Sequence, residues 1–318
     1  MRMQDRDSWP ELARAGQTVV KLREGEAGEI PLIIIHGGGG AIHAFGPLQR
    51  KFRSALWALQ VTPDTPLTTV QEQASFYYHK IKSERRTGPY RIAAFSASSI
   101  IGFALTLLFE HNGDEVIQLA LIDHLPTTFL APVLGIDVTK TPLQHPRARK
   151  EFIDTSLDNL VAMTRRDGGG NVPRRHRLAD GLADARKGLP TAPFIQSHKD
   201  VLDRFLSQVF DFMLTICGIS EMPASSEIAQ REPDGRKNIK ALEDWLKRVN
   251  APVSIYLGSY GMIGSVPVEH RKDWHDLGIH SCFPNAKIKH LHAGHYDILD
   301  NDVLIRSLQE GFIPSSRM

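Results

Sequence analysis

The feature that most restricts the fold is a serine placed where a strand changes abruptly into a helix. Residues 91–95 form an apolar run with strand character, and the apolar residues from 98 to 110 predict a helix directly after it. A sharp turn between two such elements lifts a serine hydroxyl away from the backbone, where it can act as a nucleophile. Ser96, which occupies this turn, is therefore the candidate for the reacting atom.

The residues two before and two after the serine are Ala94 and Ser98. In a strand-to-helix elbow these positions must be small, because strand and helix pack closely and the nucleophile has a strained backbone. The usual pattern has glycine at both positions. Ala94 and Ser98 are also small, but they lack the backbone freedom of glycine. The alternative interpretation is that Ser96 is an ordinary serine in a strand–helix connection.

Strands and helices alternate along much of the chain, which is typical of a parallel, doubly wound α/β sheet. Residues 31–36 form a continuous apolar run, as expected for a strand that is buried on both faces of the sheet. Further strands are expected at residues 18–22, 57–61, 91–95, 116–122, 253–257 and 286–291, and helices at 70–83, 98–110 and 302–312.

The pattern changes between residues 127 and 250, where the sequence is predominantly helical, rich in charge and interrupted by glycines and prolines. We interpret this segment as a helical lid inserted into the α/β fold. The expected organisation is a first part of the core over 1–126, the lid over 127–250 and a second part of the core over 251–318.

Composition excludes several functional classes. A formal net charge of +2 gives no basic footprint for nucleic acid. Cys217 and Cys282 have no metal-ligand spacing and are interpreted as reduced, partly buried residues. The charged N-terminus is followed by no apolar run of signal length, and no segment approaches a membrane span. We expect a soluble, cytoplasmic protein without a bound metal and without a nucleic-acid or membrane partner.

A serine nucleophile needs a base, and the base needs an orienting carboxylate. His295 follows the last expected strand, where a loop at the carboxyl edge of the sheet can reach back over the elbow, and Gly294 allows that loop to turn tightly. Its neighbours His292, His290 and His280 are the competing histidines. The position after the final strand favours His295 as the base.

The candidate for the carboxylate is Asp123, which ends the strand that follows the elbow helix. Its side chain should emerge at the same edge of the sheet as Ser96, one strand away. The strand at 253–257 runs into Gly258-Ser259-Tyr260-Gly261 and offers no carboxylate at its end. Asp123 could alternatively cap the next segment or pair with an arginine. Asp297 lies only two residues beyond His295 and is expected to anchor the loop.

Acyl transfer also requires backbone N–H donors for the oxyanion of the tetrahedral intermediate. One donor is expected from Ala97, the residue after the nucleophile, and a second from Gly38 or Gly39 in the loop after the strand at 31–36. The four glycines at 37–40 also suggest a phosphate-binding loop. That interpretation is weaker, because the lysine of a P-loop and the spacing of a dinucleotide site are absent.

Three motifs together resemble the thioesterase domains that end polyketide synthases and nonribosomal peptide synthetases. They are Gly88-Pro89-Tyr90 leading into Ser96, the strand that ends in Leu121-Ile122-Asp123, and Gly294-His295-Tyr296-Asp297. The resemblance covers nearly the whole chain apart from the lid. It implies an α/β-hydrolase fold with Ser96 as nucleophile, His295 as base and Asp123 as orienting acid, while Ala94 and Ser98 depart from the family pattern.

The resemblance further implies a thioesterase that releases a polyketide or peptide chain by hydrolysis or cyclisation. Its partner would be an acyl or peptidyl carrier protein whose phosphopantetheine holds the substrate as a thioester; no cofactor of its own is implied. Basic clusters in the lid could meet an acidic carrier, although such runs are usually solvated helix faces. They comprise Arg147, Arg149, Lys150, Arg165, Arg166, Arg174, Arg175 and Arg177.

Two other functions remain compatible with the residues. One is a carboxylesterase or lipase-like hydrolase of small esters, which would use the same three side chains. The other is a hydrolase-fold binding protein without catalysis, for which the altered elbow would be the sign. An apolar stripe from Val201 to Met213 suggests a lid helix that packs on the core and also lines an acyl channel.

Overall fold

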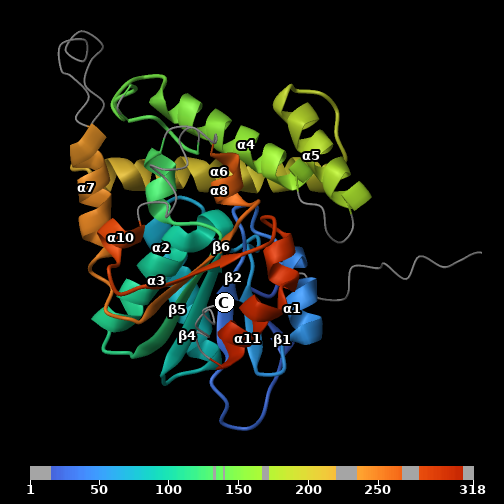
Figure 1. The fold of residues 1–318 in the computed structure, drawn as a ribbon, viewed down its shortest axis with the longest axis vertical. Helices are drawn as coiled ribbons and strands as arrows, with labels where there is room; N and C mark the ends of the chain where they lie inside the picture. Colours follow the sequence, from blue (N-terminus) through green and yellow to red (C-terminus); the bar gives the residue numbers. More distant parts are fainter. Residues whose placement is uncertain are drawn as a thin grey trace, which may run out of the picture.

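A computed structural model describes residues 16–131, 134–138, 140–166, 172–219, 235–266 and 279–310. Its centre is a seven-stranded sheet with helices on both faces (Figure 1). The strands are β1 (Val19–Arg23), β2 (Leu32–Ile35), β3 (Leu56–Leu59), β4 (Tyr90–Phe95), β5 (Val116–Ile122), β6 (Val253–Gly258) and β7 (Lys287–Leu291).

The strand order is β1-β3-β2-β4-β5-β6-β7. Strand β1 pairs with β3 in the antiparallel sense, and every other pairing in this sheet is parallel. The predicted α/β fold with a mostly parallel, doubly wound sheet is confirmed. In this order β4, β5 and β6 are neighbours, so the segments that follow them meet at one edge of the sheet.

The sheet is buried on both faces because successive side chains of a strand point to opposite sides. In β2, Ile33 and Ile35 belong to one apolar cluster and Leu32 and Ile34 to the other, and all four are fully buried. Helices α2 (Val70–Glu84) and α3 (Ser99–His111) cover the first face, and α1 (Gly46–Lys51) and α11 (Asp302–Glu310) cover the second. Alternate residues of this apolar strand therefore pack into the two apolar clusters on opposite faces of the sheet.

Between β5 and β6 the described residues are predominantly helical, in the segment where an insertion is predicted. This segment holds α4 (Ala148–Arg166), α5 (Val172–Arg186), α6 (Pro193–Ile216) and α7 (Gly235–Leu246). Helices α4, α5 and α6 extend across the top of the sheet, and α7 stands beside α3 (Figure 1). Trp245 of α7 contacts Phe103 of α3 at 6.1 Å and Phe212 of α6 at 4.9 Å between ring centroids.

Short elements complete the described chain and shape the loops around the sheet. The short helices are η1 (His43–Phe45), η2 (Ser96–Ser98), η3 (Pro126–Leu130), α8 (Met262–Ser265), α10 (Ile279–Cys282) and η6 (Asp297–Asp300). Within the described part of the chain, no helix has both the length and the apolar character needed to cross a membrane.

Candidate active site

Ser96, His295 and Asp123 form a continuous line of hydrogen bonds. The Ser96 hydroxyl lies 2.8 Å from Nε2 of His295, and Nδ1 of the same ring lies 2.7 Å from Oδ2 of Asp123. His295 and Asp123 are fully buried, and Ser96 is only 8% exposed. The structure thus brings together, in the predicted order, three residues that are 27 and 172 positions apart in the chain. Such a line can move a proton from the serine to the imidazole.

Ser96 occupies a tight turn between β4 and α3. Its φ is 59°, in the left-handed region that non-glycine residues rarely adopt, and η2 begins at this residue. Strain of this kind is held in place by the surrounding packing. Ala94 stands where the usual elbow has a glycine, and it faces Gly102 on α3. A Cβ added to Gly102 would lie 2.8 Å from the Ala94 Cβ. Gly102 therefore makes room for the larger Ala94.

Asp123 also has a left-handed backbone, with a φ of 54° at the end of β5. Its carboxylate accepts the N–H of Gly258 at 2.8 Å on Oδ1 and that of Met262 at 3.0 Å on Oδ2. A Cβ on Gly261 would lie 2.0 Å from Oδ2, so the chain after β6 passes directly against the carboxylate. The end of β6, which carries no acid, instead provides donors that fix the acid of its neighbour.

His295 lies in the loop after β7 and stacks on Phe95, with 4.9 Å between ring centroids and 28° between ring planes. Two of the competing histidines have other surroundings: His290 is exposed on β7, and exposed His292 lies 3.3 Å from the Tyr260 hydroxyl. The side chain of His280 lies outside the described residues. Asp297 begins η6, and the carboxylate bound to the imidazole is that of Asp123.

The predicted oxyanion donors lie together beside the serine. A Cβ on Gly38 would be 3.5 Å from the Ala97 Cβ, and one on Gly37 would be 3.8 Å from the Ser96 Cβ. Among the described residues, no acceptor is hydrogen-bonded to the amides of Ala97, Gly38 or Gly39. Two backbone segments therefore converge next to the nucleophile with amides available to a ligand oxygen.

His124 was not among the predicted site residues, although it follows Asp123 at the carboxyl end of a strand. Its Nδ1 lies 2.8 Å from the Ser99 hydroxyl, and its Nε2 lies 2.8 Å from the Thr128 hydroxyl. Burial, together with nearby His295, lowers the pKa of His124 to about 3. The ring is therefore neutral at physiological pH and adds no positive charge beside His295.

His36 is a second histidine that no sequence motif identified. It directly follows β2 and is fully buried, with Nε2 2.7 Å from the Tyr77 hydroxyl and Nδ1 2.5 Å from the Gly37 carbonyl oxygen. The Ser98 hydroxyl lies 3.3 Å from the same Nδ1. Burial lowers the pKa of His36 to about 4. The residue that replaces the second elbow glycine, Ser98, thus contacts the histidine that holds the glycine loop.

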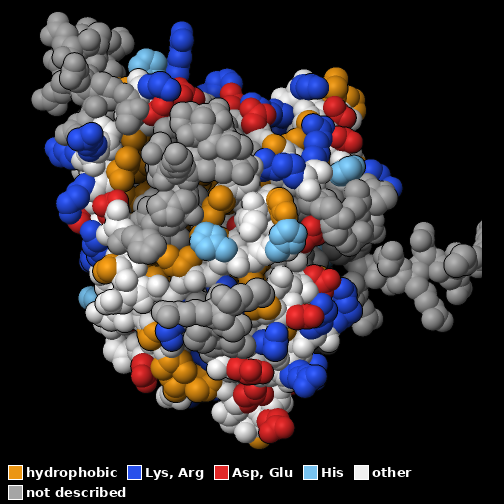
Figure 2. Space-filling view, in the orientation of Figure 1, with side chains coloured by type: hydrophobic (Ala, Val, Ile, Leu, Met, Phe, Trp, Pro, Cys, Tyr) orange, Lys and Arg blue, Asp and Glu red, His pale blue; other side chains and the backbone are white. Residues whose placement is uncertain are grey.

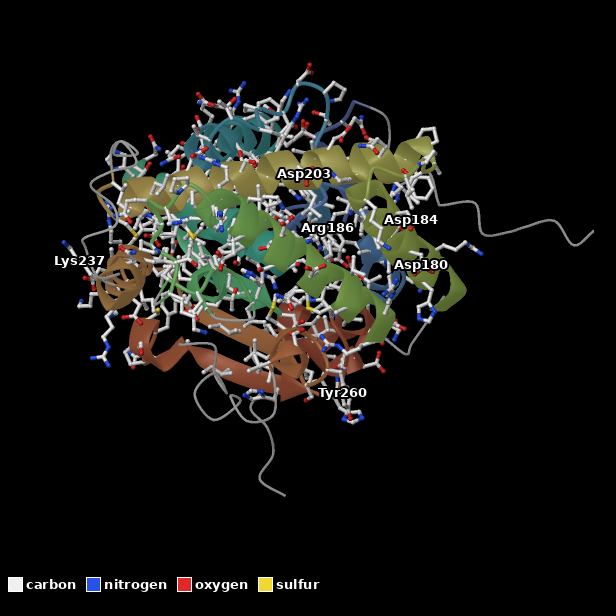
Figure 3. The ribbon with its side chains drawn as sticks, turned by 90° about the horizontal axis from the view of Figure 1, so that it is seen from above. Asp180, Asp184, Arg186, Asp203, Lys237 and Tyr260 are labelled. Carbon is white, nitrogen blue, oxygen red and sulfur yellow. The ribbon has the colours of Figure 1, made fainter. Side chains whose placement is uncertain are left out.

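Ser96 opens into a cavity of about 1810 Å³ beneath the helices that follow β5. The predicted apolar stripe of α6 packs on the core, with Leu202, Phe205, Leu206, Val209, Phe210 and Met213 all in one buried cluster. Val201, Leu202 and Leu206 of this stripe also line the cavity. Tyr260, which is 50% exposed, also lines the cavity and lies at the outer edge of the molecule in the view from above (Figure 3).

Part of the predicted basic cluster is engaged within the protein. Arg149 pairs with Asp211 and lies 4.9 Å from the centre of the Phe210 ring, and Arg165 lies 2.6 Å from Asp180. Arg166 donates to the Gly264 carbonyl oxygen at 3.0 Å. Figure 2 shows Lys and Arg side chains mixed with Asp and Glu over α4 and α5. Arg147 and Arg177 are exposed, and the side chains of Arg174 and Arg175 lie outside the described residues.

In the described ranges, no group of three or more His, Cys, Asp or Glu side chains is placed to hold a metal ion. Cys282 is buried, and burial raises the pKa of the Cys217 thiol to about 11, which disfavours the thiolate.

The sequence is similar to known proteins. The family model described as thioesterase domain matches residues 30–166. A highly reducing polyketide synthase of Strobilurus tenacellus is 32% identical over 95% of this chain and 10% of its own length. The polyketide synthase PksR of Bacillus subtilis is 26% identical over 35% of this chain and 4% of its own length. This chain therefore spans a tenth or less of these relatives.

The fold also has a counterpart among solved structures. A holo four-domain nonribosomal peptide synthetase superposes with a TM-score of 0.52, at 15% identity, over 92% of this chain and 20% of that one. At this identity the likeness concerns the fold alone.

Proposed function

We propose that this chain, whose residues 30–166 match the thioesterase domain model, releases a polyketide or peptide acyl chain from a carrier protein through a covalent intermediate on Ser96. The observation that carries the proposal is the buried line from Ser96 through His295 to Asp123. The polyketide synthase that matches 95% of the chain favours a polyketide substrate. The carrier would present that substrate as a phosphopantetheine thioester.

In the proposed first half-reaction, the Ser96 oxygen attacks the thioester carbonyl carbon while Nε2 of His295 accepts its proton. The carbonyl oxygen becomes an oxyanion, which the amides of Ala97 and of Gly38 or Gly39 stabilise. The carbon–sulfur bond then breaks, and the leaving thiol takes the proton from His295. Asp123 accepts the Nδ1–H throughout, which fixes the tautomer and stabilises the imidazolium.

In the second half-reaction, His295 accepts a proton from the group that attacks the acyl carbon. The bond between that carbon and the Ser96 oxygen then breaks, and the Ser96 oxygen takes the proton from His295. Water gives a free acid, an internal hydroxyl or amine gives a lactone or lactam, and a carbon nucleophile gives Claisen closure. The helices from α4 to α6 act in this proposal as a lid over the cavity. Their apolar side chains, such as Leu202 and Leu206, fit an acyl chain.

The test is the mass of the intact protein after incubation with a fluorophosphonate and, separately, with a soluble acyl thioester. The wild-type protein should gain one adduct and Ser96→Ala none, with unchanged circular dichroism. His295→Ala should lose almost all labelling, whereas His292→Ala should keep it. An adduct that persists on Ser96→Ala, or equal losses at both histidines, would contradict the proposal.

A carboxylesterase acting on small esters is the second candidate, because it would use the same three side chains. The second-order rate constants for a thioester and an oxygen ester of equal chain length separate the two. A preference for the oxygen ester would favour the esterase. A wild-type protein that takes up no fluorophosphonate would favour a binding protein without catalysis.

A further inference from the structure

A buried line of polar side chains connects α6 to the glycine loop beside Ser96. The Gln208 amide lies 2.5 Å from Oε1 of Gln73, whose own amide lies 3.1 Å from the Tyr77 hydroxyl. That hydroxyl lies 2.7 Å from Nε2 of His36, and Nδ1 of His36 lies 2.5 Å from the Gly37 carbonyl oxygen. All four side chains are at most 1% exposed. The line runs from the helical segment over the cavity, through α2, to the end of β2.

The donor and acceptor properties of these groups fix which group donates in each hydrogen bond of the line. The Gly37 carbonyl oxygen can only accept, so Nδ1 of His36 carries the proton and Nε2 of the neutral ring accepts from the Tyr77 hydroxyl. The Tyr77 oxygen then accepts from the Gln73 amide, and Oε1 of Gln73 accepts from Gln208. Burial, which lowers the pKa of His36 and raises that of Tyr77, supports the neutral forms. The Gln73 amide also lies 3.5 Å from Nε2 of His36, and removing the Gln208 amide leaves the buried Oε1 of Gln73 without this donor.

The last hydrogen bond of the line acts on the proposed oxyanion hole. A trans peptide is planar, with its C=O and N–H on opposite sides, so fixing the Gly37 carbonyl also fixes the direction of the Gly38 N–H. The Gly37 oxygen additionally accepts the Gly40 N–H at 2.9 Å. The glycines of this loop have only hydrogen atoms as side chains, so their own side chains cannot fix the loop by packing. The hydrogen bonds to the Gly37 carbonyl oxygen hold the loop backbone instead.

Helix α6 touches the same loop a second time, about two to three turns before Gln208. A Cβ on Gly39 would lie 1.8 Å from Cε1 of His198, and one on Gly38 would lie 3.0 Å from Cδ1 of Leu202. His198 and Leu202 belong to α6, as does Gln208. Side-chain packing and the hydrogen-bonded line therefore both depend on the position of this one helix.

We propose that Gln208 is a positioning residue for the oxyanion hole: through Gln73, Tyr77 and His36 it aligns the Gly37–Gly38 peptide when α6 is seated on the core. The inference rests on the proposed acyl-enzyme function. It makes seating of the lid helix a condition for stabilising the oxyanion, although Gln208 touches no substrate. Loss of the line should therefore lower the rate of acylation and leave ground-state binding of the thioester unchanged.

The experiment uses Gln208→Met, which keeps the length of the side chain, and Tyr77→Phe, which removes one oxygen atom. We measure kcat and KM for a soluble acyl thioester and the inhibition constant of a trifluoromethyl ketone, whose hydrated adduct occupies an oxyanion hole. Each variant should lose about tenfold or more in kcat, with a parallel loss in ketone affinity and little change in KM; removal of a complete donor costs 10² to 10³. The double variant should lose less than the product of the two single losses.

Val209→Ala is the matched control, because it disturbs packing of the same helix at a fully buried position outside the hydrogen-bonded line. It should lower the melting temperature and leave the ketone affinity unchanged. The inference is overturned if Gln208→Met keeps the ketone affinity of the wild type, or if Val209→Ala loses as much. If Gln208→Met does not fold, the same comparison with Tyr77→Phe decides. A wild-type protein that forms no adduct at Ser96 would overturn the proposed function, and this inference with it.

Discussion

Ala94 on β4 and Gly102 on α3 are in direct contact across the elbow, and a side chain at residue 102 would leave 2.8 Å between the two Cβ atoms. Real Cβ contacts are longer than this, so the strand and helix can approach only if one of the two residues is glycine. The usual elbow has its glycine in the strand, at the position of Ala94. Here the glycine of the contact is Gly102 in the helix. This pairing lets β4 and α3 pack closely on either side of Ser96, whose φ is 59°.

Gly102→Ala should destabilise the protein by roughly 1–3 kcal/mol, since it overpacks a closed interface. The second substitution Ala94→Gly should restore most of that loss by removing the opposing methyl group. Urea unfolding of the two single variants and the double variant measures the coupling. Gly46→Ala is the control, because the nearest atom to its added Cβ is the end of the flexible Arg50 side chain at 3.5 Å. Additive effects of the two changes would contradict the contact.

Asp123→Asn should lower the acylation rate by about 10⁴-fold and leave thioester binding nearly unchanged, because an amide favours the wrong imidazole tautomer. The amide also cannot accept hydrogen bonds from Gly258, Met262 and His295 at once, so a moderate loss of stability is expected. Single-turnover acylation and thermal unfolding measure the two effects. Asp297→Asn should retain acylation, and the reverse result would assign the acid to Asp297.

Charge reversal at Arg147, which is exposed, should slow turnover of a carrier-bound thioester and weaken its dependence on salt. Turnover of a small soluble thioester should hardly change, because Arg147 does not line the cavity. Rate constants for both substrates at two ionic strengths provide the test. Arg149→Glu should instead reduce stability, since Arg149 joins α4 to α6 through Asp211. Equal changes for both substrates would remove the docking role.

Acid should destabilise the fold through its two buried histidines. The pKa of His36 is lowered to about 4 and that of His124 to about 3, so below pH 6.5 the unfolded chain binds protons that the folded chain does not. Above pH 6.5 these two histidines do not lower the free energy of unfolding, because they are neutral in both states. As the pH falls from 6.5 toward the folded pKa, each histidine lowers the free energy of unfolding by up to about 1.4 kcal/mol per pH unit. Urea unfolding between pH 6.5 and 4.5 measures the slope. An unchanged slope in His36→Asn would contradict this account.

The strands and their carboxyl edge were predictable because apolar runs and strand–helix alternation depend on local sequence. The predicted strand at 116–122 is β5 without a change of boundary. The positions of Ser96, Asp123 and His295 follow from the same pattern, since parallel strands end at one edge. The roles of Gly102, His36 and Gln208 were not predictable, because each depends on a contact between residues far apart in the chain. The antiparallel pairing of β1 likewise depends on the tertiary fold.

The close approach of Gly261 to Asp123 limits how this site can change during evolution. A side chain at residue 261 would need the space that the Asp123 carboxylate now occupies, because a Cβ there would lie 2.0 Å from Oδ2. The present acid would have to be lost before residue 261 could gain a side chain. A carboxylate at residue 261 and one at residue 123 therefore exclude each other on this backbone, so an exchange between these two positions by single changes would pass through a form that has neither.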